Sequence, residues 1–288
     1  MTQDKPNRFK VHRRSKSPPP ATGPSIANVK PTSVFFSSQD IRPFPKNALL
    51  LYGFHAVREA LRNKDRQHLI LYATEPAARR LESEITTSGL VPRIVTTENL
   101  SRMLVAGAVH QGVALVTLGL SSPDLSAIPS GRGLVVVLDQ ITDPHNVGAI
   151  LRLAAAFGVD AVITTERHAA ELYGVTAKAA SGGLEHVSVV RVVNLARALR
   201  DLGDLGYLRI GLDSEAATNL AAIELRYPLA LVLGGEGKGL RRLSRENCDT
   251  LARLDLPGPI KSLNVSNACA VALTLLQRGL AASSTFRP

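Results

Sequence analysis

The chain has 288 residues, of which 45% are hydrophobic, and its 34 Lys and Arg against 24 Asp and Glu give a formal net charge of +10. At roughly 100–200 residues per domain, this length predicts about two domains. There are only two cysteines, Cys248 and Cys269, which excludes a disulfide scaffold and a zinc–thiolate cluster. The sequence has no apolar run of about 20 residues, which excludes a membrane-spanning helix, and no apolar stretch near residue 1, which excludes a secretory signal.

Residues 1–46 carry most of the excess charge, with nine Lys and Arg against two Asp, and they hold eight of the 17 prolines. Such a segment buries too little apolar surface to offset its chain entropy, so we predict a disordered basic tail. It would serve either as a non-specific RNA-binding arm or as a dispensable solubilising extension. Together with the reduced cysteines, it favours a bacterial cytoplasmic protein over one with a mitochondrial presequence.

Residues 47–119 are predicted to form a small α/β domain. Phe54, Val57 and Leu61 recur at helical spacing, which predicts a helix over 54–63. Strands are expected at 68–74, 92–97 and 112–117, and helices at 98–104 and at 75–88, the latter ending at Gly89. Residues 120–133 are rich in Ser, Pro and Gly and are predicted to be a linker.

Residues 134–288 alternate strands with helices, which predicts a mostly parallel sheet covered on both faces. Strands are expected at 135–139, 161–165, 187–193, 208–212, 229–233 and 252–256, and helices at 146–157, 172–180, 195–202, 244–249 and 262–280. Such sheets bind ligands at the carboxyl ends of their strands. Three loops of this region concentrate polar residues and glycine.

The first loop runs from Asp139 to Arg152 (DQITDPHNVGAILR). Asn146 is typical of a helix N-cap, which would be a purely structural role. Arg152 precedes three alanines, and a charge is unusual in so apolar a helix, although a surface ion pair would also explain it. The two residues are six positions apart, which corresponds to about 600° of helical rotation, so we expect Arg152 to reach back toward the helix start.

The second loop, GGEGKG at 234–239, follows an apolar strand and suits close approach of backbone to a ligand. It departs from the nucleotide phosphate loop, because Lys238 is followed by Gly239 instead of Ser or Thr. Glu236 would also repel a triphosphate. The loop therefore favours a ligand that is neutral or cationic at its contact point.

The third loop runs from Leu254 to Ser266 (LDLPGPIKSLNVS) into a helix of small residues. Either Ser262 or Asn264 could cap that helix. Capping does not explain Ser262, Asn264 and Ser266 together. The seven histidines show no spacing typical of ligands, so no metal site is predicted, and both cysteines are expected to be core thiols.

Together the three loops resemble, in order and spacing, the motifs of the SpoU/TrmH family of RNA ribose 2′-O-methyltransferases in the SPOUT superfamily. The N-x-x-x-x-x-R motif matches Asn146 and Arg152, the G-x-E-G-x-G motif matches 234–239, and the S-L-N-V-S-x-A motif matches 262–268. Residues 51–117 are similar to the family's N-terminal substrate-binding domain, which resembles small ribosomal-protein-like RNA binders. Residues 180–189 (ASGGLEHVSV) are most similar to the bacterial subgroup that methylates a guanosine ribose in 23S rRNA.

The resemblance implies a trefoil-knotted C-terminal α/β domain, a homodimer, and S-adenosylmethionine as the cofactor. The implied cofactor contacts are Gly234, Gly235, Gly237, Leu254, Leu256 and Leu263. The family's proposed base corresponds to Arg152, with Asn146 and Glu236 as neighbours, and Ser262 and Asn264 would hold Arg152 or the ribose and phosphate. One departure is Leu254-Asp255-Leu256, where the family usually has Ile-Pro-Met.

Arginine stays charged in proteins, so stabilisation of a developing alkoxide is an alternative role for Arg152. Three other functions are alternatives: a tRNA methyltransferase of the same family, an RNA-binding homologue without catalysis, and an ATPase or kinase. All five implied catalytic residues are present, which argues against the second, and Gly239 argues against the third. The resemblance therefore implies an S-adenosylmethionine-dependent RNA ribose 2′-O-methyltransferase that acts on a guanosine in 23S rRNA, with a tRNA methyltransferase of the same family as the alternative.

Overall fold

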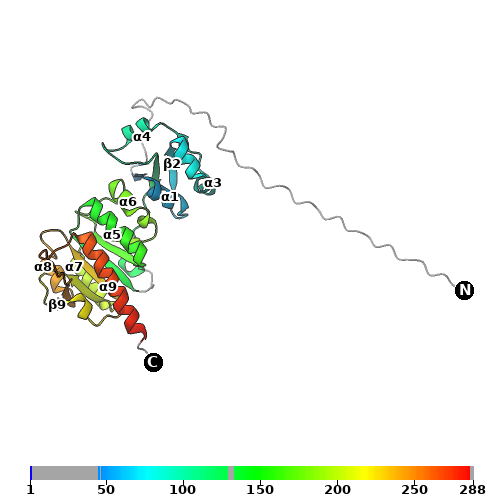
Figure 1. The fold of residues 1–288 in the computed structure, drawn as a ribbon. Coiled ribbons are helices and arrows are strands. Elements are labelled where there is room, and N and C mark those ends of the chain that lie inside the picture. The colour runs from blue at the N-terminus through cyan, green and yellow to red at the C-terminus, as the bar shows by residue number, and fades with distance from the viewer. Residues whose placement is uncertain (2–44, 46, 129–132, 286–288) are drawn as a thin grey trace. The chain divides into compact units, whose positions relative to one another are not determined.

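The structure is a computed structural model that describes Met1, Pro45 and residues 47–128 and 133–285. The described residues from Pro45 onward belong to one compact unit, whose helices and strands are coloured along the chain in Figure 1. Apart from Met1 and Pro45, the predicted tail at 1–46 lies outside the described residues, and so do residues 129–132 of the predicted linker.

The first part of the chain forms a four-stranded sheet in the order β1-β4-β2-β3. The strands are β1 (Ala48–Tyr52), β2 (His68–Ala73), β3 (Arg93–Ile94) and β4 (Val113–Leu118). Strand β4 is antiparallel to both β1 and β2, and β2 is parallel to β3. Strand β1 was not predicted from the sequence, and β3 is shorter than the strand predicted over 92–97.

Four helices accompany this sheet: α1 (Phe54–Arg62), α2 (Glu75–Arg80), α3 (Glu82–Ser88) and α4 (Thr97–Met103). The prediction of a single helix over 75–88 is wrong, because the chain turns at Leu81 (φ −105°, ψ 12°) and two helices form instead. The Leu81 side chain is fully buried in the core at this turn. Helix α3 ends, as predicted, at Gly89 in the left-handed conformation (φ 71°).

The second part forms a seven-stranded sheet in the order β7-β6-β5-β10-β8-β11-β9. Its strands are β5 (Leu134–Asp139), β6 (Ala161–Thr165), β7 (Ser188–Val192), β8 (Leu208–Leu212), β9 (Thr218–Asn219), β10 (Leu229–Gly234) and β11 (Thr250–Arg253). Each neighbouring pair is parallel. The predicted α/β class with a mostly parallel sheet is therefore confirmed, although β9 was not predicted and β11 begins and ends earlier than expected.

Helices connect these strands: α5 (Pro144–Phe157), α6 (Val175–Ala180), α7 (Leu195–Asp204), α8 (Arg242–Glu246) and α9 (Val265–Thr285). Three 3₁₀ turns add to them: η2 (Leu125–Ala127), η3 (Gly183–Glu185) and η4 (Leu220–Ala222). The helices predicted to begin at 172 and 262 start three residues later, at Val175 and Val265. Helix α8 begins and ends earlier than the predicted 244–249.

Alternate residues of β5 face two separate cores, as the period of a strand requires. Leu134, Val136 and Leu138 belong to the larger core, to which α5 and α9 contribute. Val135 and Val137 belong to the second core, to which α7 contributes. Helices thus cover both faces of the sheet, and α5 and α9 lie side by side on one of them (Figure 1).

A buried ion pair joins the first part of the chain to η3. The Nη2 and Nε atoms of Arg66 lie 2.8 Å from the two carboxylate oxygens of Glu185, and the two side chains are only 1% and 3% exposed. Arg66 Nη1 also donates to the Leu118 carbonyl (3.0 Å), and Asn63 donates to Glu185 (2.8 Å). These hydrogen bonds compensate the burial of both charges.

Replacing Arg66 by alanine should leave the buried Glu185 carboxylate with Asn63 as its hydrogen-bond donor. Breaking a buried pair from one side costs roughly 3–5 kcal/mol, so we expect Arg66→Ala to lower the free energy of unfolding by that amount in a urea titration. The matched control is Arg79→Ala, whose pair with Glu75 is largely exposed and is worth less than about 1 kcal/mol. Equal losses in the two variants would contradict the structural role of the Arg66 pair.

The two cysteines differ in exposure but share an unreactive environment. Cys269 is fully buried, as predicted, whereas Cys248 is half-buried. Burial raises the pKa of each thiol to about 12. We therefore expect iodoacetamide at pH 8 to label the native protein far more slowly than the urea-unfolded chain, because the thiolate is the reactive form. Equal labelling rates would show that the thiols are accessible and ionised.

Among the described residues, no helix is long and apolar enough to cross a bilayer, and no three His, Cys, Asp or Glu side chains gather as metal ligands.

Candidate active site

The start of helix α5 carries the first sequence motif. Asp143 is its N-cap: the carboxylate accepts from the Asn146 backbone N–H (3.0 Å), and Pro144 occupies the first helical turn. The prediction that Asn146 caps this helix is therefore wrong. Because Asp143 caps the helix, the buried Asn146 amide is available to donate from Nδ2 to Glu236 Oε1 (2.8 Å).

The start of helix α9 carries the third motif and settles which residue caps it. Asn264 Oδ1 accepts from the backbone N–H and the hydroxyl of Ser266 (2.9 and 2.6 Å), so Asn264 is the cap. Its Nδ2 donates to Glu236 Oε1 at 2.8 Å. One carboxylate oxygen of Glu236 thus accepts from two amides that belong to the starts of two different helices.

The loop that carries Glu236 has glycines where the backbone leaves no room for a side chain. A Cβ on Gly234 would lie 2.2 Å from the carbonyl carbon of Gly239, and one on Gly235 would lie 2.6 Å from the carbonyl oxygen of Gln140. The loop closes through a hydrogen bond from Gly239 N–H to the Gly235 carbonyl (3.0 Å). Gly239 itself has a φ of 61°, which favours glycine.

A second ion pair anchors the end of this loop. Asp139, the last residue of β5, is fully buried, and its carboxylate accepts from the backbone N–H (2.9 Å) and the Nε (2.6 Å) of Arg241. Sequence reasoning assigned no role to either residue. The available signal was a carboxylate at the end of an otherwise apolar strand, since such a group needs a partner when buried.

A cavity of about 360 Å³ lies between the second and third motifs, within the size range of small-molecule sites. Its lining includes every residue predicted to contact the cofactor, namely Gly234, Gly235, Gly237, Leu254, Leu256 and Leu263. Glu236, Ser262 and Lys261 also line it. Leucine side chains beside glycine backbone and a carboxylate fit a ligand with an apolar ring system and a cationic centre, as S-adenosylmethionine has.

Asp255, which departs from the family's usual motif, does not line this cavity. Its carboxylate pairs with Arg253 (3.0 Å) and accepts from the Asn219 amide. The change from the usual proline therefore lies outside the lining, whereas both flanking leucines belong to it.

Arg152 stands apart from the other predicted catalytic residues. Its side chain is exposed, lies outside the lining of the cavity, and makes no hydrogen bond or ion pair within 47–128 and 133–285. Six residues of α-helix leave Arg152 about 240° around the axis from Asn146, and the expected reach toward the helix start is not seen. Its backbone packs instead against Gly183 of η3, where an added Cβ would lie 2.9 Å from the Arg152 Cα.

Comparison with known families matches residues 133–274 to the SpoU rRNA Methylase family. Residues 50–121 match the family described as RNA 2'-O ribose methyltransferase substrate binding. Among solved structures, the SpoU methyltransferase AviRb from Streptomyces viridochromogenes in complex with the cofactor AdoMet superposes with a TM-score of 0.69 at 23% identity, covering 81% of this chain and 90% of that chain. This likeness supports the fold described above.

Sequence relatives extend over most of the chain. The 23S rRNA (guanosine-2'-O-)-methyltransferase RlmB of Xylella fastidiosa (strain 9a5c) is 41% identical over 235 residues, or 77% of this chain and 93% of the relative. The protein of the same name from Yersinia pestis is 40% identical over 244 residues, or 81% of this chain and 99% of the relative. The chain belongs to the SpoU rRNA methylase family.

Proposed function

We propose that the protein transfers a methyl group from S-adenosylmethionine to the ribose 2′-oxygen of a guanosine in 23S rRNA. The observation that carries the proposal is the convergence of the second and third motifs on one cavity, with Glu236 tied to Asn146 of the first motif. The relatives named as 23S rRNA guanosine methyltransferases support the choice of substrate.

The cofactor, when bound, supplies a methyl group activated by a sulfonium centre. Leu254, Leu256 and Leu263 would hold its apolar parts, and the backbone at 234–237 would approach it closely. The negative charge of Glu236 favours a cationic ligand over a neutral one. Holding reactants in an in-line geometry supplies roughly 7–11 kcal/mol in good cases, so positioning is the main task of these residues.

The ribose hydroxyl is a poor nucleophile, and its proton must be removed or polarised. Asn146 and Asn264 would orient the ribose, because Glu236 fixes both amides, and Ser262 at the cavity would contribute a hydroxyl. We assign to Arg152 an electrostatic role toward the developing alkoxide and the adjacent phosphate. A guanidinium keeps its proton in proteins, so this role suits it better than that of a base.

The organisation of the chain is part of the proposal. We assign RNA substrate binding to 47–119, a linker to 120–133 and the methyltransferase domain to 134–288, with 1–46 as a basic tail. We include a trefoil knot in the last domain. It is supported by the path of the chain after β11, a strand near one edge of the sheet: Asn264 contacts Glu236, and α9 then packs on α5. We also propose a homodimer in the bacterial cytoplasm, and light scattering of the purified protein tests the dimer.

Incubation with methyl-labelled S-adenosylmethionine and separate unmodified 23S rRNA, 16S rRNA and tRNA transcripts tests the reaction. We expect label in the 23S transcript alone, at an alkali-resistant ribose position of a guanosine. Label confined to tRNA would refute the substrate, and label on a base would refute the 2′-oxygen as acceptor. If no naked transcript is labelled, the same incubation is repeated with partly assembled 23S rRNA, which carries ribosomal proteins and comes from a strain lacking the enzyme. Absence of label in that substrate would refute catalysis.

The Asp139–Arg241 pair anchors the loop at 234–239, so we expect it to affect the affinity for S-adenosylmethionine. We expect Arg241→Ala to raise the Kd for S-adenosylmethionine about tenfold in calorimetry, because a hydrogen bond between charged groups is worth roughly 1.5–3 kcal/mol. Arg242→Ala is the matched control, since that neighbouring arginine pairs with Glu246 on the exposed side of α8. Equal Kd values for both variants would show that the loop holds its shape without Arg241.

A further inference from the structure

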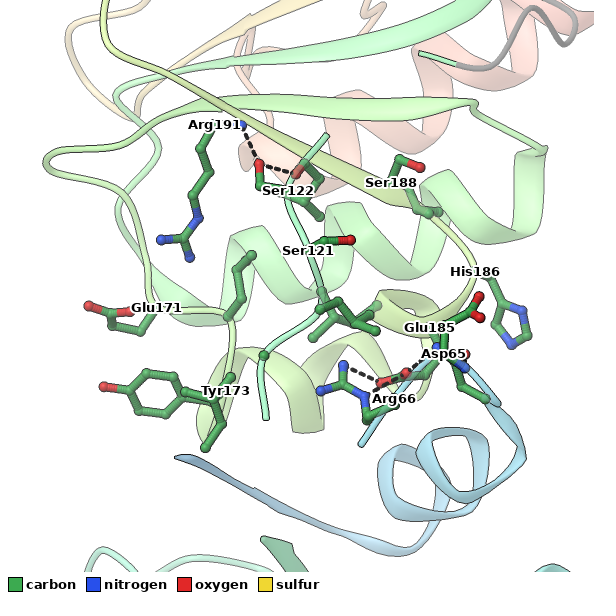
Figure 2. A pocket seen from close by; sticks show the side chains of 18 of the residues that line it. Asp65, Arg66, Ser121, Ser122, Glu171, Tyr173, Glu185, His186, Ser188 and Arg191 are labelled. Carbon is green, nitrogen blue, oxygen red and sulfur yellow. Dashed lines mark hydrogen bonds and ion pairs between the residues drawn. The ribbon is translucent and has the colours of Figure 1, made fainter. Parts of the chain in front are cut away.

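A second and larger cavity, of about 630 Å³, lies where residues 119–122 pass beside η3 and β7. It shares no lining residue with the proposed cofactor cavity. Figure 2 shows Arg191, Glu171 and Tyr173 on one side of the linker and Glu185 and His186 on the other. Both parts of the chain line this cavity, because Asp65 and Arg66 precede β2 whereas Arg191 belongs to β7.

The walls of this cavity are fixed by hydrogen bonds. The Ser122 hydroxyl donates to the Val189 carbonyl (2.8 Å) and accepts from the Arg191 backbone N–H (3.0 Å), so the linker is attached to strand β7 at the edge of the sheet. On the far side, the buried pair of Arg66 and Glu185 closes the wall. The cavity is therefore shaped before any ligand binds.

Three lining side chains have unused binding capacity. The Arg191 guanidinium and the Glu171 carboxylate are exposed and make no hydrogen bond or ion pair with the rest of 47–128 and 133–285. Tyr173 is 39% exposed. In contrast, the charges of Arg66 and Glu185 neutralise each other.

This combination matches the chemistry of one unpaired nucleotide. A guanidinium binds a phosphate, an exposed aromatic ring stacks on a base, and a carboxylate accepts from the N–H groups of a base edge. Glu171 would repel a second phosphate, which disfavours the regular backbone of a duplex. A small anion would use Arg191 alone and would leave Tyr173 without a role.

The location also fits an RNA chain that reaches the proposed active site. Arg191 lies near the carboxyl end of β7, and Glu236 follows the carboxyl end of β10. Because the strands of this sheet are parallel, both residues lie where the carboxyl ends of its strands meet. Three strand spacings of about 4.8 Å separate the two strands, or about 14 Å. Val189 belongs to the core to which α5 contributes. Side chains two residues apart in a strand point to the same face, so Arg191 lies on the face of the sheet that α5 covers.

We propose that this cavity binds an unpaired nucleotide of the RNA substrate, with its phosphate on Arg191 and its base against Tyr173. The inference rests on the proposed function, since it requires an RNA substrate. It assigns to the junction between the two parts of the chain a contact distinct from both the cofactor cavity and the site of methyl transfer.

Binding of unmodified 23S rRNA transcript to the full chain, measured over a range of salt concentrations, tests the proposal. We expect Arg191→Ala to weaken binding about tenfold and to reduce the slope of log K against log salt by about 0.7–0.9, the value for one phosphate contact. Tyr173→Ala should weaken binding about tenfold without changing the slope, as stacking does. Tyr173→Phe, which keeps the ring, should bind like the unmodified protein.

Arg197→Ala is the matched control, because Arg197 is an exposed arginine of α7, on the opposite face of the sheet. Unchanged binding in both the Arg191 and Tyr173 variants, or equal weakening by Arg197→Ala, would overturn the cavity proposal. In the same samples the Kd for S-adenosylmethionine should stay constant. RNA binding by the unmodified protein without methyl transfer to either the transcript or the partly assembled 23S rRNA would overturn the proposed function alone, and absence of RNA binding would overturn both.

Discussion

Replacing Glu236 by alanine is expected to lower kcat/KM for 23S rRNA by on the order of 10²–10³, because it removes the acceptor that orients two amides together with the charge beside the cofactor cavity. The variant should fold, since the Glu236 side chain is exposed. Its free energy of unfolding should fall by about 1–3 kcal/mol, because the buried Asn146 amide loses its partner. Single-turnover kinetics and urea titrations measure the two effects.

Glu236→Gln separates geometry from charge. The glutamine oxygen can still accept from Asn146 and Asn264, but the negative charge is gone. We expect this variant to lose its preference for S-adenosylmethionine over the neutral S-adenosylhomocysteine while keeping the stability of the unmodified protein. Glu246→Ala, which removes an exposed carboxylate of α8, should leave all three quantities unchanged. Full activity of Glu236→Ala would refute the place of Glu236 in the reaction.

Arg152→Ala is expected to reduce kcat by on the order of 10²–10³ with little change in the Kd for S-adenosylmethionine, because stabilisation of a developing negative charge acts in the transition state. Its thermal midpoint should match that of the unmodified protein, since the described residues offer this exposed side chain no hydrogen bond to lose. The split between kcat and cofactor Kd distinguishes this role from a structural one.

Arg152→Lys keeps the positive charge but loses the forked geometry of the guanidinium. We expect activity between that of the alanine variant and that of the unmodified protein. Nearly full activity would exclude a special guanidinium role, and nearly full activity of Arg152→Ala would exclude any catalytic role.

Sequence patterns predicted the larger features of the fold because each depends on neighbouring residues. The alternation of apolar strands and helices after Leu134 sufficed for the α/β class, and the glycine run sufficed to locate the loop at 234–239. Strand β1 was not predicted, although Ala48–Tyr52 (ALLLY) is an apolar run like those of the predicted strands. No local pattern records its pairing with β4, which joins Leu51 to Leu115, and the same holds for the pairing of β5 with β10.

The wrong prediction that Asn146 caps α5 has a different cause, because the sequence itself indicates the correct cap, Asp143. Asp143 followed by Pro144 is the typical start of a helix, with the cap just before proline at the first position. That signal is local, so the sequence alone suffices to place the cap at Asp143. By contrast, the contacts from Asn146 and Asn264 to Glu236, and the partner of Asp139, depend on tertiary packing and cannot be inferred from spacing.

The residues that meet at Glu236 are far apart along the chain. Asn146 precedes Glu236 by 90 residues and Asn264 follows it by 28, and the central ladder pairs Leu134 with Leu229. Closing loops of this length costs chain entropy before the contacts can offset it, and parallel pairing at long range is slow for that reason. A partly folded chain therefore contains the three motifs but no cavity, and competence for catalysis arises only when the slowest contacts of folding have formed.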